Sequence, residues 1–228
     1  MRALSNAFAA AVLLLAGTAH ALDFGSLSNK DAAAGLKEAL SQGAGKAVGL
    51  LGRADGFLGN PQVKIPLPES LQQVEGLMRG LGMGKYADEL VTTMNRAAEA
   101  AVPEAKALLL NSIKQMSVQD AKTILSGGDD AATQYFRRTT AEPLGARFKP
   151  IVQKAMARVK LAEKYDQFAG KAAKFGLVKE SDAHLENYVT GKALDGLYLM
   201  IAAEEKAIRQ DPVGAAGGMA KKVFGLLK

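Results

Sequence analysis

The sequence predicts an all-α protein: a single-domain helical bundle with one extended, proline-containing segment near residues 54–68. Two observations predict this class. Apolar residues recur three or four positions apart along most of the chain, which is the spacing of helices with one buried face. Glycine, proline and capping residues interrupt this pattern at intervals typical of a bundle. Because no fixed repeat and no low-complexity linker divides the chain, we expect one domain.

The longest helical pattern covers residues 185–212. Within it, an apolar stripe is formed by Leu194, Leu197, Tyr198, Ile201 and Ile208. Glu204 and Glu205 flank this stripe, one on each edge, where a carboxylate needs a partner because burying an isolated charge is costly. We expect Glu205 to be at least partly buried and to pair with Arg209, or with Arg137 or Arg138. The alternative is a polar site inside the bundle, with both glutamates as ligands or bases.

Earlier segments show the same periodicity. Further helices are predicted at residues 29–51, 68–79, 85–102, 104–116 and 117–126. Ser28 is the expected N-cap of the first, and Ser117 with Asp120 resembles a capping box at the start of the last. Pro103 is expected to break or kink the chain between two of these helices.

A long helical region follows the glycine pair Gly127-Gly128. Asp129 is expected to cap its first helix, since aspartate is a favoured N-cap residue. Pro143 and Pro150 punctuate the part from residue 142 to about 175, and breaks are expected there at positions that the pattern does not give.

Residues 54–68 are the least helical part of the chain. Apolar Val63, Ile65 and Leu67 alternate with other residue types, which indicates extended chain. Pro66 and Pro68 exclude a central strand. We expect an edge strand or a polyproline-like strap over the helices, with Ile65 and Leu67 buried.

The first 21 residues have the pattern of a secretory signal peptide. Arg2 precedes an apolar run from Phe8 to Ala16, and Ala19-His20-Ala21 provides an A-x-A cleavage site. We expect cleavage after Ala21, so that residues 22–228 form the mature domain. Position 22 is Leu and the chain has no cysteine, which excludes a lipid-anchored lipoprotein and disulfides. No later apolar run approaches the roughly 20 residues of a membrane-spanning helix, so we expect an exported protein, soluble in the periplasm.

The formal net charge is +6, with basic and acidic residues mixed along the chain. Nucleic-acid binding is not expected, because there is no basic block and little interleaving with aromatic residues. An anionic membrane surface or another envelope protein stays open as a partner. A basic, amphipathic C-terminal helix after Pro212 is expected to dock onto the protein body, with binding to a bilayer as the alternative.

Several chemistries are excluded by residue type. After Ala21 the chain has one histidine, His184, and no cysteine, so a cysteine nucleophile and a zinc site built on several His or Cys are impossible. No P-loop, nucleophile elbow or dinucleotide fingerprint occurs. His184 is expected at the surface or half-buried. We predict no catalytic residue, no cofactor and no metal site.

A polar cluster on the helix at 85–102 consists of Asn95, Arg96 and Glu99. It lies opposite the apolar face, as a solvated surface would. Arg96 and Glu99 are three residues apart and are spaced to pair with each other. If a further helix covers this face, the same residues become a buried polar network; both alternatives stay open.

Several motifs together resemble a known family. They are DGFLGNPQVKIPLP (55–68), MNRAAEAAV (94–102), the Asp-Ala-x-x-Ile-Leu-x-Gly run (120–127), AATQYFRR (131–138), LDGLYLMIAAEEKAIRQDPV (194–213) and KKVFG (221–225). In this order they resemble the uncharacterised family catalogued as domain of unknown function 4197, over essentially the whole mature chain. The resemblance implies an exported bacterial protein with no assigned activity, and it supplies no catalytic residues.

Three functions remain as hypotheses. The first is a non-enzymatic, exported module that binds a protein or the envelope. The second is a carrier of an apolar or amphipathic small molecule, held between helices. The third is a carboxylate-dependent hydrolase that uses a glutamate pair as acid and base. The candidate ligand-binding residues are Glu204, Glu205, Arg209, Arg137, Arg138 and Tyr135.

Overall fold

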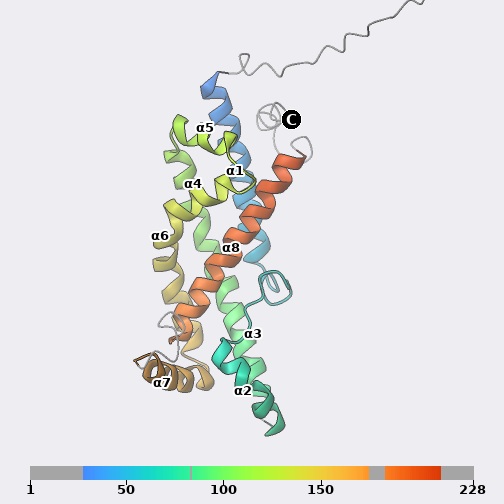
Figure 1. The fold of residues 1–228 in the computed structure, drawn as a ribbon, viewed down its shortest axis with the longest axis vertical. Helices are drawn as coiled ribbons and strands as arrows, with labels where there is room; N and C mark the ends of the chain where they lie inside the picture. The colour runs from blue at the N-terminus through green and yellow to red at the C-terminus, as the bar shows by residue number, and fades with distance from the viewer. Residues whose placement is uncertain (1–27, 83, 175–182, 212–228) are drawn as a thin grey trace, which may run out of the picture.

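The computed structural model describes residues 28–82, 84–174 and 183–211 (Figure 1). In chain order, its elements are α1 (Asn29–Leu51), α2 (Glu69–Gly80), α3 (Gly84–Ala101), the 3-10 turn η2 (Val102–Glu104), α4 (Ala105–Gln115), α5 (Val118–Ser126), α6 (Ala131–Met156), α7 (Lys160–Lys174) and α8 (Leu185–Gln210). No strand occurs in these described ranges, so the all-α prediction is confirmed. None of the helices found there is both long enough and apolar enough to cross a membrane.

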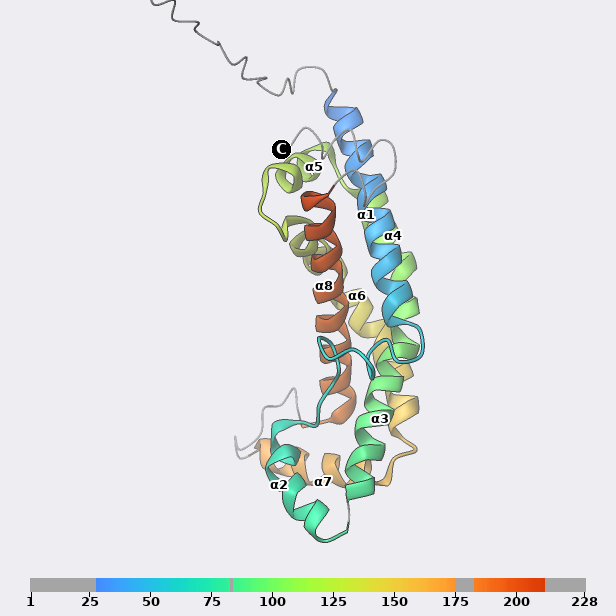
Figure 2. The same cartoon turned by 90° about the vertical axis from the view of Figure 1, so that its right-hand side faces the viewer.

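The bundle is long and narrow (Figures 1 and 2). Its centre is α8, which runs along the length of the molecule and packs mainly on α6 and α1. α5 lies at one end, and α2 and α7 lie at the other. The predicted signal peptide and the predicted helix after Pro212 fall outside the described residues.

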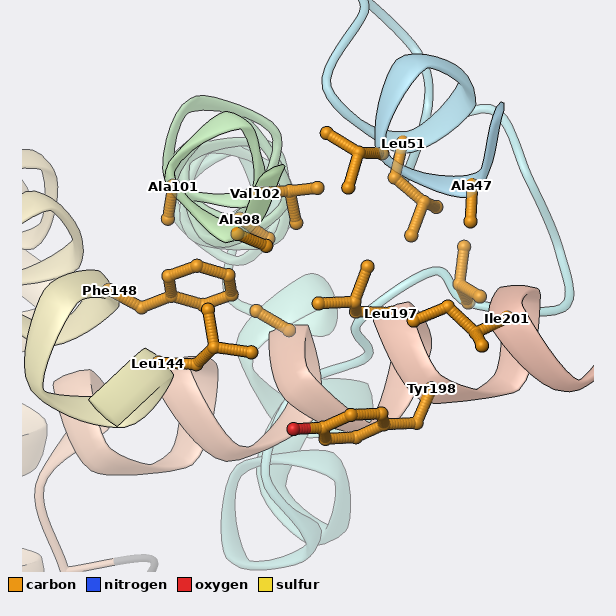
Figure 3. Close-up of a cluster of buried hydrophobic side chains, with 14 of the residues drawn as sticks. Ala47, Leu51, Ala98, Ala101, Val102, Leu144, Phe148, Leu197, Tyr198 and Ile201 are labelled. Atoms are coloured by element: carbon orange, nitrogen blue, oxygen red, sulfur yellow. The ribbon is translucent and has the colours of Figure 1, made fainter. Parts of the chain in front are cut away.

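α1, α3 and α6 pack on α8 in the core (Figure 3). Leu144 and Phe148 of α6 point toward Leu197 of α8, and Ala98 and Ala101 of α3 close the opposite side. All five side chains are fully buried. Because alanine has a short side chain, α3 approaches its neighbours closely, and large residues on α6 and α8 fill the space.

The cap predictions have mixed outcomes. Ser28 caps α1 by accepting the Asp31 N–H at 3.1 Å, as predicted. Ser117 and Asp120 form the complete capping box at the start of α5. The prediction that Asp129 caps the next helix is wrong. The N-cap position of α6 is Asp130, whose side chain makes no capping hydrogen bond.

α6 continues through both of its prolines, and the break expected in residues 142–175 falls after them, between Met156 and Lys160. Each proline removes one backbone hydrogen bond from the helix. Packing offsets this loss, since Leu144, Phe148 and Val152 are completely buried along this part of α6. Pro103 lies in the 3-10 turn between α3 and α4, where the break was predicted.

Residues 54–68, which we call the strap, lie against the helices (Figure 2). Residues 54–63 form turns, and only residues 64–68 are extended. Val63, Ile65 and Leu67 are all buried, so the predicted docking of this segment is confirmed. Gly196 in α8 has no side chain, which allows the strap to approach this helix closely. A Cβ atom there would lie 2.7 Å from the Phe57 ring, so the contact of the strap with α8 requires glycine.

Candidate functional site

The carboxylate of Glu205 is buried at the beginning of α6, with 4% of the residue exposed. It accepts the backbone N–H groups of Ala132 and Thr133, both at 2.9 Å, and the Thr133 hydroxyl at 2.9 Å. These N–H groups belong to the first turn of α6, where they have no partner within the helix. Glu205 therefore supplies from α8 the cap that no aspartate supplies locally.

Arg209 completes this arrangement. Its guanidinium donates to Glu205 at 2.9 and 3.2 Å, and it also donates to the Ile124 carbonyl of α5 at 2.9 Å. The expected pairing of buried Glu205 with Arg209 is confirmed. Glu205 and Arg209 thus join α8 to α5 and α6, which is a structural role.

The other predicted ligand residues do not gather around Glu205. Glu204 pairs instead with Lys46 of α1 at 2.8 Å. Arg137 pairs with Asp195 at 3.2 Å and lies over the Tyr198 ring. The two neighbouring glutamates therefore contact different helices and do not form an acid–base pair.

Arg138 and Tyr135 form a further separate group on α6. The Arg138 guanidinium lies 5.5 Å from the centre of the Tyr135 ring and 3.8 Å from Asp120. The Tyr135 hydroxyl donates to the Ser112 carbonyl at 3.0 Å. These contacts tie α6 to α4 and α5.

In the polar cluster of α3, Asn95 and Glu99 are buried and Arg96 is exposed. The element that covers the two buried residues is the strap, not a further helix. Glu99 accepts the backbone N–H groups of Phe57 and Leu58, each at 3.0 Å. Arg96 bridges Glu99 at 2.7 Å and Asp55 at 2.8 Å, so the predicted pair is confirmed. Successive N–H groups that converge on one carboxylate fix the turn at the start of the strap.

Asn95 holds the second half of the strap. Its Oδ1 accepts the Ile65 N–H at 2.8 Å, and its Nδ2 donates to the Ile65 carbonyl at 2.9 Å. The Tyr188 hydroxyl of α8 donates to the Pro66 carbonyl at 3.1 Å. Side chains thus supply the hydrogen bonds that a neighbouring strand would supply in a sheet.

Between the strap, α6 and α8 lies an open groove of about 520 Å³. Its apolar part includes Val63, Pro66 and Leu199, and Leu199 is 49% exposed. Exposed Lys64 of the strap and Lys192 of α8 also line it. These residues could not be predicted from the sequence as one site, because only folding brings positions so far apart in the chain to one surface.

Tyr198 lines the same groove, and its hydroxyl lies 2.9 Å from that of Thr140. Burial raises the pKa of Tyr198 above its ordinary value, while the Thr140 hydroxyl and the charge of Arg137 act in the opposite direction. Tyr198 is thus neutral at physiological pH and serves as part of the wall.

One group of side chains in the described residues has the donor atoms for a metal ion. Asp166 of α7, His184 and Glu186 place one ligand atom each within 4.8 Å of one another. His184 is exposed, as predicted. Burial raises the pKa of Asp166, and the hydrogen bond from the Leu185 N–H opposes this shift.

The family comparison agrees with the motifs. The model of a family described as a protein of unknown function, DUF4197, matches residues 26–225. The chain belongs to this family. No curated protein and no solved structure matches the chain. The family has no known function.

Proposed function

We propose that this member of the DUF4197 family is an exported, non-enzymatic binding protein of the periplasm. We further propose that the groove between the strap, α6 and α8 takes an extended, acidic segment of another envelope protein. The pattern of residues 1–21 supports export. The residues that line the groove support the binding of an acidic segment.

The state of the buried carboxylates favours binding over catalysis. A general acid or base must reach a substrate proton from within a cleft. Glu205 is engaged by two backbone N–H groups, a hydroxyl and a guanidinium, and Glu99 by two N–H groups and a guanidinium. Both lie where they hold elements together.

The groove combines an apolar contact with positive charge. Leu199 is a large apolar side chain that is half exposed, and Lys64 and Lys192 line the same surface from opposite elements. Arg137 is already paired with Asp195, so the remaining charges of the lining are Lys64, Lys192 and Asp130, two positive and one negative. A segment that offers an apolar side chain and acidic side chains matches these contacts.

Site-specific photocrosslinking in the native periplasm tests the proposal. A photoreactive residue at Leu199 should give a discrete adduct with a polypeptide. Val118 of α5 provides the matched control, since it is 48% exposed but lies outside the groove. Replacing Lys64 and Lys192 together by Glu should abolish the adduct at position 199. A polypeptide adduct of equal yield at both positions, or one that survives the charge reversal, would refute the proposal.

The carrier hypothesis is the second candidate, and one observation favours it. A volume of about 520 Å³ lies within the roughly 300–1,000 Å³ of small-molecule sites. The same experiment separates the two, because a carrier would give an adduct at Leu199 with the mass of a small molecule.

A further inference from the structure

Asp166, His184 and Glu186 converge where α7 meets the beginning of α8. Asp166 lies within α7, His184 is the N-cap residue of α8 and Glu186 is in its first turn. Their ligand atoms, one imidazole nitrogen and two carboxylate oxygens, all lie within 4.8 Å of one another. Asp166 lies 18 residues before His184 and 20 residues before Glu186 in the sequence. The packing of α7 against the start of α8 therefore brings the three side chains together.

Two contacts hold the group in place. Asp166 Oδ1 accepts the Leu185 N–H at 2.9 Å, which fixes the backbone between His184 and Glu186. Leu185 itself is completely buried, and Ala162, one turn before Asp166 on α7, is buried as well. The three ligands therefore start from anchored backbone, and the second oxygen of Asp166 is left for another partner.

The charge of the surroundings is unusual for this protein. Asp166, Glu186 and Glu163 line one pocket of about 340 Å³. The described residues that complete its lining, Gln153, Met156, Ala157 and Ala162, include no basic side chain. Three carboxylates around one hollow, in a chain with a net charge of +6, favour a cationic ligand.

We propose that Asp166, His184 and Glu186 bind a divalent transition-metal ion, with Zn²⁺ as the representative ion. Imidazole nitrogen suits zinc and its neighbours, whereas Mg²⁺ and Ca²⁺ prefer oxygen ligands alone. Zinc binds such donors at about 2.0–2.2 Å, which places ligand atoms about 3.4 Å apart in a tetrahedral site. From separations of up to 4.8 Å, small rotamer changes suffice to reach this geometry.

The proposed site is open to solvent, and its three ligands would leave one coordination position of the ion for a further ligand. Exposed His184 faces solvent, so the ion can enter without opening the bundle. A three-ligand set leaves the fourth tetrahedral position to water or to another group.

Calorimetric titration of the untagged full chain with Zn²⁺ tests the proposal. One ion per chain should bind, and His184→Ala, Asp166→Asn and Glu186→Gln should each weaken binding at least about tenfold, as loss of a zinc ligand or its support does. Asp166→Asn retains an oxygen acceptor for the Leu185 N–H, so it removes charge while preserving the start of α8. Far-ultraviolet circular dichroism establishes that each variant is folded.

Two controls make the result specific. Glu89→Gln removes an exposed carboxylate of α3, outside this group, and should leave zinc affinity unchanged. Mg²⁺ should bind far more weakly than Zn²⁺, because the imidazole of His184 suits zinc and not magnesium. A patch of carboxylates alone would not distinguish the two ions in this way. Unchanged zinc affinity in His184→Ala, equal binding of the two ions, or no saturation with zinc would each overturn the proposal.

A second readout reports on the fold. An ion that bridges α7 and α8 stabilises the folded state in proportion to its binding. Zn²⁺ should therefore raise the Tm of the wild-type chain and, at the same zinc concentration, raise that of Asp166→Asn by less. The imidazole resonances of His184 should shift on addition of zinc, and an unshifted His184 signal at saturating zinc would place the ion elsewhere.

Discussion

The carboxamide of Asn95 forms both hydrogen bonds that an adjacent β-strand would form with Ile65, at 2.8 and 2.9 Å. Asn95 and Ile65 are both buried, so water cannot replace these bonds. An extended segment with no neighbouring strand must pair its buried backbone groups by other means. In this protein a helix supplies the pairing through one side chain.

Replacing Asn95 by Ala should destabilise the protein by about 3 kcal/mol, because two buried backbone groups lose their partner and each costs about 1–3 kcal/mol. Urea unfolding measures the loss, and hydrogen exchange at the Ile65 amide reports on the strap directly. Asn111→Ala is the control, since Asn111 is exposed on α4 and its loss should cost less than about 0.5 kcal/mol. Protection of the Ile65 amide at the wild-type level in Asn95→Ala would contradict this role.

Glu205 and Glu204 provide a matched pair of neighbouring residues on α8. Glu205→Gln should destabilise the protein by about 3–5 kcal/mol, because the partly buried guanidinium of Arg209 then loses the charge of Glu205. Glu204 pairs with Lys46, whose side chain is 62% exposed, so Glu204→Gln should cost about 1 kcal/mol or less. Thermal melting of both variants separates the two cases, and equal losses would show that Glu205 does not anchor α6.

The helices could be predicted from the sequence because their signals are local. Ser28, Ser117 and Asp120 act on backbone groups within four residues, and the apolar stripe around Leu197 repeats at a fixed period. The strap could also be predicted to dock, since alternating apolar residues such as Ile65 must be buried somewhere.

The roles of the polar residues could not be predicted in the same way. Glu99 caps a turn 41–42 residues earlier in the chain, and Glu205 caps a helix 72–73 residues earlier. In both cases the partners are backbone N–H groups, which every residue except proline has, so no residue type marks them in the sequence. Asp129 was the local candidate for the α6 cap, and a distant carboxylate occupies that position instead.

The contact between α8 and the strap gives a further prediction. Gly196→Ala should destabilise the protein by about 1–3 kcal/mol, because the new methyl group would overlap the buried Phe57 ring. Gly191, in the same helix, has no atom within 4 Å of an added Cβ. Gly191→Ala should therefore stabilise the protein by about 0.5–1 kcal/mol. Chemical denaturation measures both changes, and a gain from Gly196→Ala would mean that the strap does not pack here.

The capping box of α5 predicts a dependence of stability on acid pH. The hydroxyl of Ser117, and then its backbone N–H, hold the pKa of Asp120 below its ordinary value of 3.8. Above pH 3.8 the Asp120 carboxyl is ionised in both the folded and the unfolded chain, and the cap contributes fully to stability. As the pH falls through the lower pKa of Asp120 in the folded state, this contribution to stability is lost. Ser117→Ala should cost about 1 kcal/mol of stability at neutral pH and reduce the loss of stability in acid. Ser126→Ala is the control: the Ser126 hydroxyl donates to the Lys122 carbonyl, so its removal should leave the loss in acid unchanged. Urea unfolding of the three proteins across acid pH tests this, and identical pH profiles for wild type and Ser117→Ala would contradict it.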